Sequence, residues 1–177
     1  MAKRAYNRPV TTTLFQVDDD ARLFISPVIE DWAIAAEHEI NVVIDLEGGL
    51  DQCIPTMPGS CLYVYFPIFD EELPDPARLD AVTMMGAHLV RTGHRVLSHC
   101  GMGFNRSALI AGRILHRLGM AGPDVVSRLR ERRPGALFND NFAEYLSSLP
   151  PIASATPAEP TTLLNAEAVA PDISAGH

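Results

Sequence analysis

One nine-residue stretch of the sequence has the residue types and spacing for phosphoryl chemistry. It reads His99-Cys100-Gly101-Met102-Gly103-Phe104-Asn105-Arg106-Ser107 and lies between an expected strand and an expected helix. A short loop in this position points successive backbone N–H groups at one spot, near the positive end of the helix dipole. Its two glycines allow the tight bend that such a loop needs. We therefore predict an anion-binding loop whose phosphate-binding residues are Gly101, Met102, Gly103, Phe104, Asn105 and Arg106.

The side chains of this loop suit nucleophilic attack on phosphorus. Cys100 is its first residue, so its sulfur is expected at the floor, where a helix N-terminus and nearby cations stabilise a thiolate. Arg106 offers a planar fork of donors for two phosphoryl oxygens. Ser107 is placed to donate a hydrogen bond to the sulfur when it leaves. Adjacent strand residues point to opposite faces, so His99 is assigned to holding the loop by hydrogen bonds rather than to proton transfer.

Attack on a phosphate monoester also requires an acid, because protonating the leaving oxygen typically adds roughly 10²–10⁴ in rate. Asp70 lies on a loop after an expected strand over 61–66. If that strand is parallel to the strand before Cys100, both end at the same edge of the sheet. Asp70 is therefore the predicted general acid. Asp75 is the main alternative, although its place before Pro76 suits a helix cap. Weaker candidates are Glu71 and Glu72.

The surrounding pattern predicts an α/β fold. Expected strands, which are short and rich in β-branched or aromatic residues, cover 12–17, 23–26, 41–46, 61–66 and 95–99. Expected helices, which have apolar stripes or Pro and Gly at their ends, cover 28–38, 76–92, 107–118, 123–133 and 141–149. Strands that alternate with helices in this way form a mostly parallel sheet of four or five strands, with helices on both faces.

Length and composition fit one globular domain with tails. Residues 21–149 are the expected catalytic domain, residues 1–20 an N-terminal segment with one short strand, and residues 150–177 a disordered tail rich in Pro, Ala and Thr. The net charge is −8, which argues against a nucleic-acid partner because phosphate backbones attract basic surfaces. No uninterrupted apolar run is long enough to span a membrane, so no membrane partner is expected.

The remaining conspicuous residues have structural interpretations. Cys53 and Cys61 are interpreted as inert thiols, and three cysteines without an apolar leader point to a reducing compartment, the cytoplasm. Trp32 is interpreted as a core residue. The histidines lack paired ligand spacing, so neither a metal nor another cofactor is expected. A basic group is interpreted as a solvated helix face that could also attract an anionic substrate: Arg128, Arg130, Arg132 and Arg133.

The stretch His99–Ser107 matches the signature loop of the cysteine-dependent protein phosphatases and looks most like the dual-specificity branch, in a small, atypical, single-domain form. The resemblance covers about residues 20–149. Further segments resemble the opening strand–helix–strand of that branch, its general-acid loop and the turn before its last helix: Leu23–Leu46, Pro67–Asp70 and Arg132–Pro134. The resemblance implies a phosphocysteine on Cys100, phosphate binding by Arg106, and an aspartate that protonates the leaving oxygen.

These features together predict metal-independent phosphomonoester hydrolysis through a phosphocysteine. The expected partner is a phosphorylated protein or another phosphomonoester, with phosphotyrosine first and phosphoserine or phosphothreonine as further substrates. Some relatives carry a second cysteine near the position of Leu46 or Glu47, and this chain does not. Two alternatives stay open. Gly103–Arg106 resembles the loop of RNA 5′-triphosphatases, although Asp70 and the negative charge speak against that activity. A non-catalytic module could bind phosphorylated proteins through the same loop.

Overall fold

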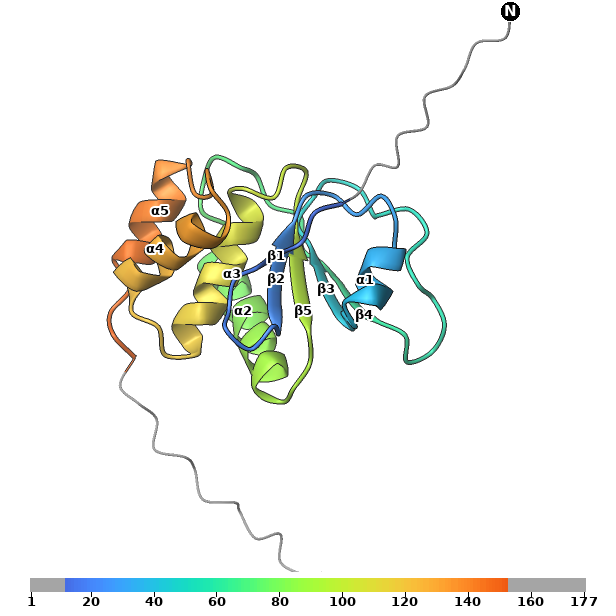
Figure 1. The fold of residues 1–177 in the computed structure, drawn as a ribbon. Helices are drawn as coiled ribbons and strands as arrows, with labels where there is room; N and C mark the ends of the chain where they lie inside the picture. The colour runs from blue at the N-terminus through green and yellow to red at the C-terminus, as the bar shows by residue number, and fades with distance from the viewer. Residues whose placement is uncertain (1–11, 153–177) are drawn as a thin grey trace, which may run out of the picture.

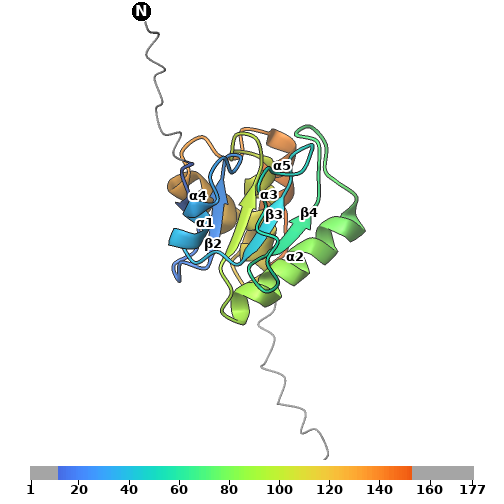
Figure 2. The same cartoon turned by 90° about the vertical axis from the view of Figure 1, so that its right-hand side faces the viewer.

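In the computed structural model, residues 12–152 are described, and they form a five-stranded sheet between helices (Figure 1). The strand order is β1-β2-β5-β3-β4, and every pairing except β1–β2 is parallel. The bounds are β1 Phe15–Gln16, β2 Leu23–Ser26, β3 Val42–Asp45, β4 Leu62–Tyr65 and β5 Val96–His99. Figure 2 shows the strands twisting relative to one another, as sheets of L-residues do. The expectation of a mostly parallel α/β sheet is confirmed.

Helices cover both faces of the sheet, unequally (Figure 1). Their bounds are α1 Ala33–Glu37, α2 Pro76–Arg91, α3 Arg106–Arg117, α4 Gly122–Arg132 and α5 Asp140–Ser147. Alternate strand residues face opposite ways. Leu23 and Ile25 therefore join the large core beneath α2 to α5, whereas Phe24 joins the small core beneath α1. No helix of residues 12–152 has the length and apolarity to cross a bilayer.

The register of the sheet brings four strand ends to one edge, which we call the carboxyl edge. His99 of β5 pairs with Ser26 of β2 on one side and with Asp45 of β3 on the other. Asp45 in turn pairs with Tyr65 of β4. The segments that follow β2, β5, β3 and β4 therefore start side by side. Cavities beyond the carboxyl ends of parallel strands are where such sheets bind ligands.

Three expected elements differ from the structure. The helix expected over 28–38 is only Ala33–Glu37, because Val28 donates its N–H to the Gly101 carbonyl at 3.4 Å, outside any helix. The strand expected over 12–17 is reduced to Phe15–Gln16. The strand expected in the core over 61–66 is the edge strand β4, and Leu62 at its start is 45% exposed.

The structure describes only part of the two predicted terminal segments. Residues 1–11 and 153–177 lie outside the described part, so the disordered tail over 150–177 stays a prediction, as does the division of the chain into three parts. Two glycines at the ends of expected helices lie within the described part. Gly93 and Gly119 follow α2 and α3 with φ of +96° and +110°, the left-handed conformation that glycine adopts without strain.

Candidate active site

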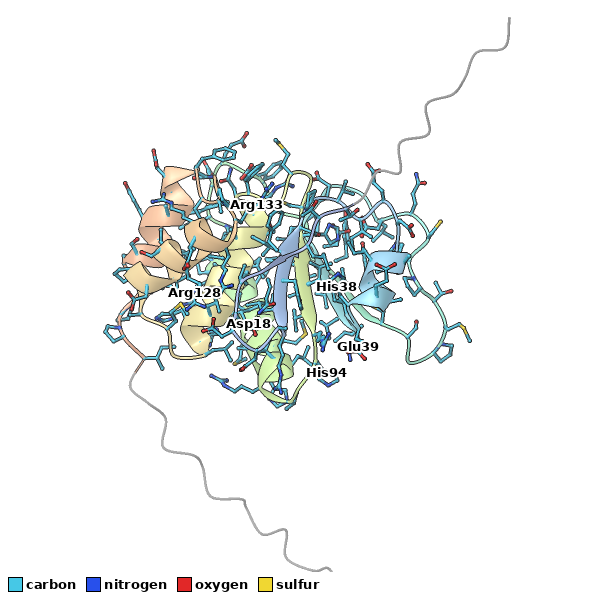
Figure 3. All side chains as sticks on the ribbon, viewed as in Figure 1. Asp18, His38, Glu39, His94, Arg128 and Arg133 are labelled. Atoms are coloured by element: carbon cyan, nitrogen blue, oxygen red, sulfur yellow. The ribbon has the colours of Figure 1, made fainter. Side chains whose placement is uncertain are left out.

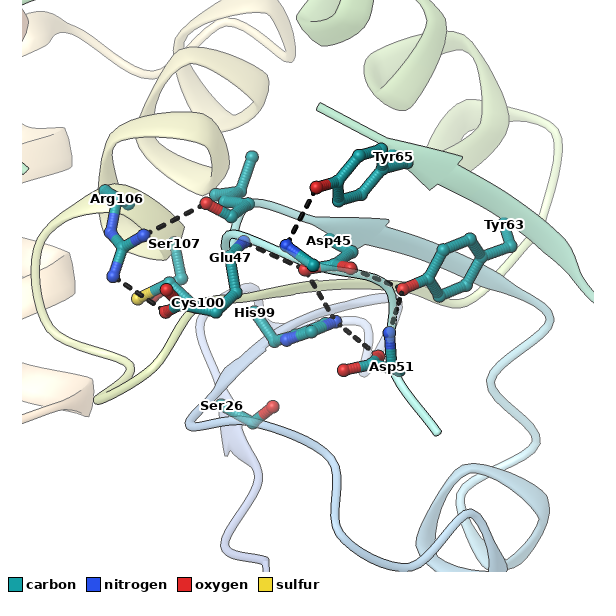
Figure 4. A network of polar contacts seen from close by, with 12 residues as sticks. Ser26, Asp45, Glu47, Asp51, Tyr63, Tyr65, His99, Cys100, Arg106 and Ser107 are labelled. Atoms are coloured by element: carbon teal, nitrogen blue, oxygen red, sulfur yellow. Dashed lines mark hydrogen bonds and ion pairs between the residues drawn. The ribbon is translucent and has the colours of Figure 1, made fainter. Parts of the chain in front are cut away.

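The loop after β5 places a cysteine sulfur at the start of α3, at the carboxyl edge (Figure 4). Cys100 is buried. The Gly103 N–H donates to its Sγ at 3.3 Å, and the Ser107 Oγ lies 3.6 Å from the same sulfur. Gly103 has φ +69°, and a Cβ there would lie 2.6 Å from the backbone of Ser26 and Pro27. Only glycine fits this bend, as the sequence indicated.

The predicted phosphate-binding arginine is the first residue of α3. Arg106 donates from Nη1 to the carbonyl oxygens of Leu46 at 3.1 Å and Ile68 at 3.4 Å. Its Nη2 donates to Glu47 Oε2 at 2.8 Å. Burial lowers the pKa of Arg106, but the hydrogen bond to Glu47 and the charges of Cys100 and other acids raise it above its ordinary value. The guanidinium is therefore a fixed cation beside the sulfur.

Glu47 is a site residue that the sequence analysis did not assign. Its carboxylate accepts from Arg106 and from the N–H of Gly48 at 3.1 Å. A Cβ added to Gly101 would lie 2.6 Å from Oε2. Burial raises the pKa of Glu47, but Arg106 and the N–H groups of Gly48 and Gly101 lower it below its ordinary value. The carboxylate uses donors expected for a phosphate and stands in for one of its oxygens. In the sequence, only its position shortly after the strand β3 indicated that this side chain could lie at the site.

Asp70 reaches the same pocket as Arg106. Both line a cavity of about 440 Å³, together with Glu47, Gly48, Pro67, Ile68 and Phe69. Asn105, which is buried, donates from Nδ2 to Asp70 Oδ2 at 3.1 Å, and Asn139 donates to the Asp70 carbonyl at 2.8 Å. The rival Asp75 accepts the Arg78 N–H at 2.9 Å as the N-cap of α2, so its expected capping role is confirmed.

Arg133 contacts the outer side of the loop. Its interpretation as part of a solvated helix face is therefore wrong. The guanidinium lies between the rings of Phe104 and Phe15, 3.9 and 4.1 Å from their centroids. It also donates to the carbonyls of Gly103 and Met102 at 3.4 Å. Burial lowers its pKa, and the charge of Cys100 opposes this. The reason is that α4 ends at Arg132 and Arg133 is extended, which turns the side chain back over the loop.

Two other arginines of that basic group, Arg128 and Arg132, lie on α4 away from the loop. In Figure 3, Arg133 lies at the carboxyl edge, whereas Arg128 lies lower on α4, beside Asp18. Arg128 and Arg132 pair with the exposed Asp19 at 2.7 and 3.0 Å. These pairs are typical of a solvated surface and contribute little to stability.

His99 does not hold the loop as expected. Its side chain is fully buried and faces two carboxylates, with Nε2 at 2.9 Å from Asp51 Oδ2 and 3.6 Å from Asp45 Oδ1 (Figure 4). Neither ring nitrogen has a hydrogen bond with any residue of 12–152. Strand alternation and the register put this side chain on the same face of the sheet as Asp45 at the end of β3, whereas the chain after it leads into α3.

The other thiols and the single tryptophan lie away from the loop. Cys53 is exposed and Cys61 half-buried, and burial raises the pKa of Cys61. Trp32 packs against the small core and donates from Nε1 to the Gln52 carbonyl at 2.8 Å. Trp32 is half-buried, so its interpretation as a core residue is confirmed only in part.

The fold is that of the dual-specificity phosphatases. Human DUSP28 is 25% identical over 78% of this chain and 93% of its own, with a TM-score of 0.61. A mouse putative dual specificity phosphatase complexed with zinc tungstate is 21% identical over 81% and 89%, with a TM-score of 0.65. Human tyrosine phosphatase-like serine/threonine/tyrosine-interacting protein is 20% identical over 75% and 92%, with a TM-score of 0.61. No protein-family model and no curated protein matches the chain.

Proposed function

We propose that the chain is a cysteine-dependent phosphatase that hydrolyses phosphomonoesters without a metal, through a phosphocysteine on Cys100. One observation carries the proposal: the buried sulfur accepts the Gly103 N–H and lies within reach of Ser107, at the N-terminus of α3 and beside Arg106. N–H groups and a helix dipole stabilise a thiolate, which is the nucleophilic form. The likeness to dual-specificity phosphatases supports the same class of reaction.

In the first step the Cys100 thiolate attacks phosphorus opposite the leaving oxygen. The S–P bond forms as the P–O bond breaks, and the electron pair of that bond goes to the leaving oxygen. The loop N–H groups and Arg106 bind the remaining phosphoryl oxygens, whose charge they stabilise as it shifts in the transition state. The Glu47 carboxylate competes with the phosphate for Nη2 of this guanidinium, whereas Nε of Arg106 has no hydrogen bond with a residue of 12–152 and is free for a phosphoryl oxygen.

Asp70 serves both steps. It gives its proton to the leaving oxygen, and afterwards takes a proton from the water that hydrolyses the S–P bond. Asn105 and Asn139 fix its position. The Ser107 hydroxyl donates to the departing sulfur in the second step and makes the thiolate a better leaving group.

We assign phosphorylated proteins as substrates, with phosphotyrosine first and phosphoserine or phosphothreonine as further targets. Exposed apolar side chains support a peptide or aromatic substrate, because apolar surface of this kind is typical of binding sites. Phe69, which lines the Asp70 pocket, is 81% exposed, and Met102 in the loop is 65% exposed. A reduced Cys100 further suits the cytoplasm.

The test is hydrolysis of p-nitrophenyl phosphate in EDTA by the reduced protein. Cys100→Ser is expected to lower kcat at least about 10³-fold, because the nucleophile is lost. Cys53→Ser removes an exposed thiol away from the loop and serves as the matched control, with unchanged activity expected. Turnover that persists in Cys100→Ser, or that requires a metal, would contradict the proposal.

The two alternatives give different results with other ligands. An RNA 5′-triphosphatase would release phosphate from triphosphate-ended RNA in preference to phosphotyrosine peptides. A non-catalytic module, which the likeness to a phosphatase-like interacting protein favours, would bind phosphotyrosine peptides tightly without turnover.

A further inference from the structure

A buried cluster of two carboxylates and an imidazole lies at the carboxyl edge and has no part in the proposed reaction (Figure 4). Asp45 ends β3, His99 ends β5, and Asp51 comes from the segment between β3 and β4. The register pairs Asp45 with His99, and Asp51 closes onto both. The side chains of Asp45 and His99 are fully buried and that of Asp51 is 3% exposed.

The atoms that face one another in this cluster are close but not hydrogen-bonded. His99 Nε2 lies 2.9 Å from Asp51 Oδ2, yet neither atom has a hydrogen bond with any residue that the structure describes. Asp45 differs, because its Oδ1 accepts the Glu47 N–H at 2.9 Å and its Oδ2 accepts the Tyr63 hydroxyl. A buried polar atom without a partner costs roughly 1–3 kcal/mol, so a missing partner is expected at this point.

The charge of the cluster also needs a partner. Within residues 12–152 the ion pairs of Asp45 and Asp51 are those with His99, and none involves an arginine. Two buried carboxylates without a neutralising charge are strongly unfavourable. A bound cation would balance them, as would a proton on the imidazole or on one of the carboxylates.

We propose that Asp45, Asp51 and His99 form a zinc site. Bonds of 2.0–2.2 Å to zinc in a tetrahedron place neighbouring ligand atoms about 3.4 Å apart. The distances from His99 Nε2, 2.9 Å to Asp51 and 3.6 Å to Asp45, bracket this value. One imidazole with two carboxylates favours zinc over magnesium and calcium, which prefer oxygen ligands alone.

The fourth position would take water, and a route for it exists. Asp51 also lines a cavity of about 430 Å³ between the segments 28–30 and 47–52. Zinc at this point would join the segment that carries Glu47 and Asp51 to the strand end directly before Cys100. It would therefore stabilise the fold around the loop without contacting a substrate.

The test uses tag-free, full-length Cys100→Ser protein, because the Cys100 thiolate could itself bind zinc. Titration calorimetry with Zn²⁺ is expected to show one ion per chain, and zinc is expected to raise Tm. Asp51→Asn should weaken binding at least about 10-fold, since it replaces a ligand. Asp124→Asn removes the same charge from an exposed position in the first turn of α4 and should leave zinc affinity unchanged.

A spectroscopic measurement keeps the test decisive if Asp51→Asn does not fold. Co²⁺ in the Cys100→Ser protein should give the visible bands of a tetrahedral nitrogen and oxygen site, without a thiolate charge-transfer band. Zinc should also shift the ring ¹⁵N resonances of one buried histidine. Absence of zinc binding, unchanged affinity in a folded Asp51→Asn, or a thiolate band would overturn the proposal and leave protonation within the cluster to balance its charge. None of these readouts depends on phosphatase activity.

Discussion

Replacing Glu47 by glutamine is expected to strengthen phosphate binding. The Glu47 carboxylate accepts a hydrogen bond from Nη2 of Arg106 at 2.8 Å in the absence of substrate, and a phosphate competes with it for this donor. When only part of the protein is in the binding-competent state, the apparent affinity falls by that fraction. The neutral amide introduced by Glu47→Gln would hold the guanidinium more weakly than the carboxylate does and would no longer repel a phosphate dianion.

The size of the effect follows from the burial of the pair. Hydrogen bonds between charged groups contribute roughly 1.5–3 kcal/mol. The Arg106 side chain is 15% exposed, but that of Glu47 is 35% exposed, so solvent screening reduces the value to about 1 kcal/mol. One kcal/mol corresponds to about 5-fold in an equilibrium constant. Glu47→Gln should therefore lower KM for p-nitrophenyl phosphate about 5-fold, by the same conversion, with little change in kcat.

Steady-state kinetics at several phosphate concentrations would measure both KM and the inhibition constant of inorganic phosphate, which should fall together. Glu39→Gln is the matched control: Glu39 pairs with Arg95 at 3.1 Å near the opposite ends of the strands, so the same charge is removed away from the site. An unchanged KM would refute the idea that Glu47 competes with phosphate for Arg106. A higher KM would show instead that Glu47 orients Arg106 for the substrate.

Three further outcomes are expected. Asp70→Asn should lower kcat for alkyl phosphates by about 10²-fold or more and for p-nitrophenyl phosphate less, because nitrophenolate leaves readily; equal losses, or a larger loss in Asp75→Asn, would contradict the acid assignment. Gly103→Ala should lower the free energy of unfolding in urea by about 2 kcal/mol through strain at φ +69°, and an unchanged urea midpoint would argue against the tight bend. The Glu47–Arg106 pair should stabilise the wild-type protein over Glu47→Gln above the ordinary carboxyl pKa of 4.5. Because the folded pKa of Glu47 is lowered, this advantage should disappear as pH falls through that lower value. Urea unfolding of both proteins at pH 7 and at a series of pH values below 4.5 would measure it, and an advantage that grew with falling pH would contradict the prediction.

The core of the candidate site was predictable because it is local in sequence. The stretch from β5 through the loop into α3 is defined by a short buried strand, two glycines and a helical stripe. Cys100 and Ser107 are only seven positions apart. Neighbours at such a separation meet whenever the strand, bend and helix form. The carboxyl-edge position of Asp70 followed from one further assumption, that β4 is parallel to its neighbour, and the structure bears that assumption out.

What the sequence did not indicate depends on contacts between distant segments. Glu47 and Arg106 are 59 positions apart, and they meet because β3 lies next to β5, a strand order that no local pattern encodes. The short α1 has the same origin: the apolar spacing over 28–38 favours a helix, but the backbone at Val28 bonds to Gly101 instead. The free energy that helix propensity contributes is small, and tertiary contacts outweigh it in such cases.

The phosphate loop therefore owes its shape to three separate segments as much as to its own residues. Arg133 holds its outer side by two carbonyls and two aromatic rings. Asn105 ties its end to Asp70, and Glu47 contacts its opening. The segments that carry Arg133, Asp70 and Glu47 contact different parts of the loop, so the loop is held in place before substrate arrives. Fixed donors need little reorganisation when charge develops on a bound phosphate, which is the condition under which backbone N–H groups lower a reaction barrier most. In the proposed reaction the loop residues supply the chemistry, and Glu47 determines how free Arg106 is to take part.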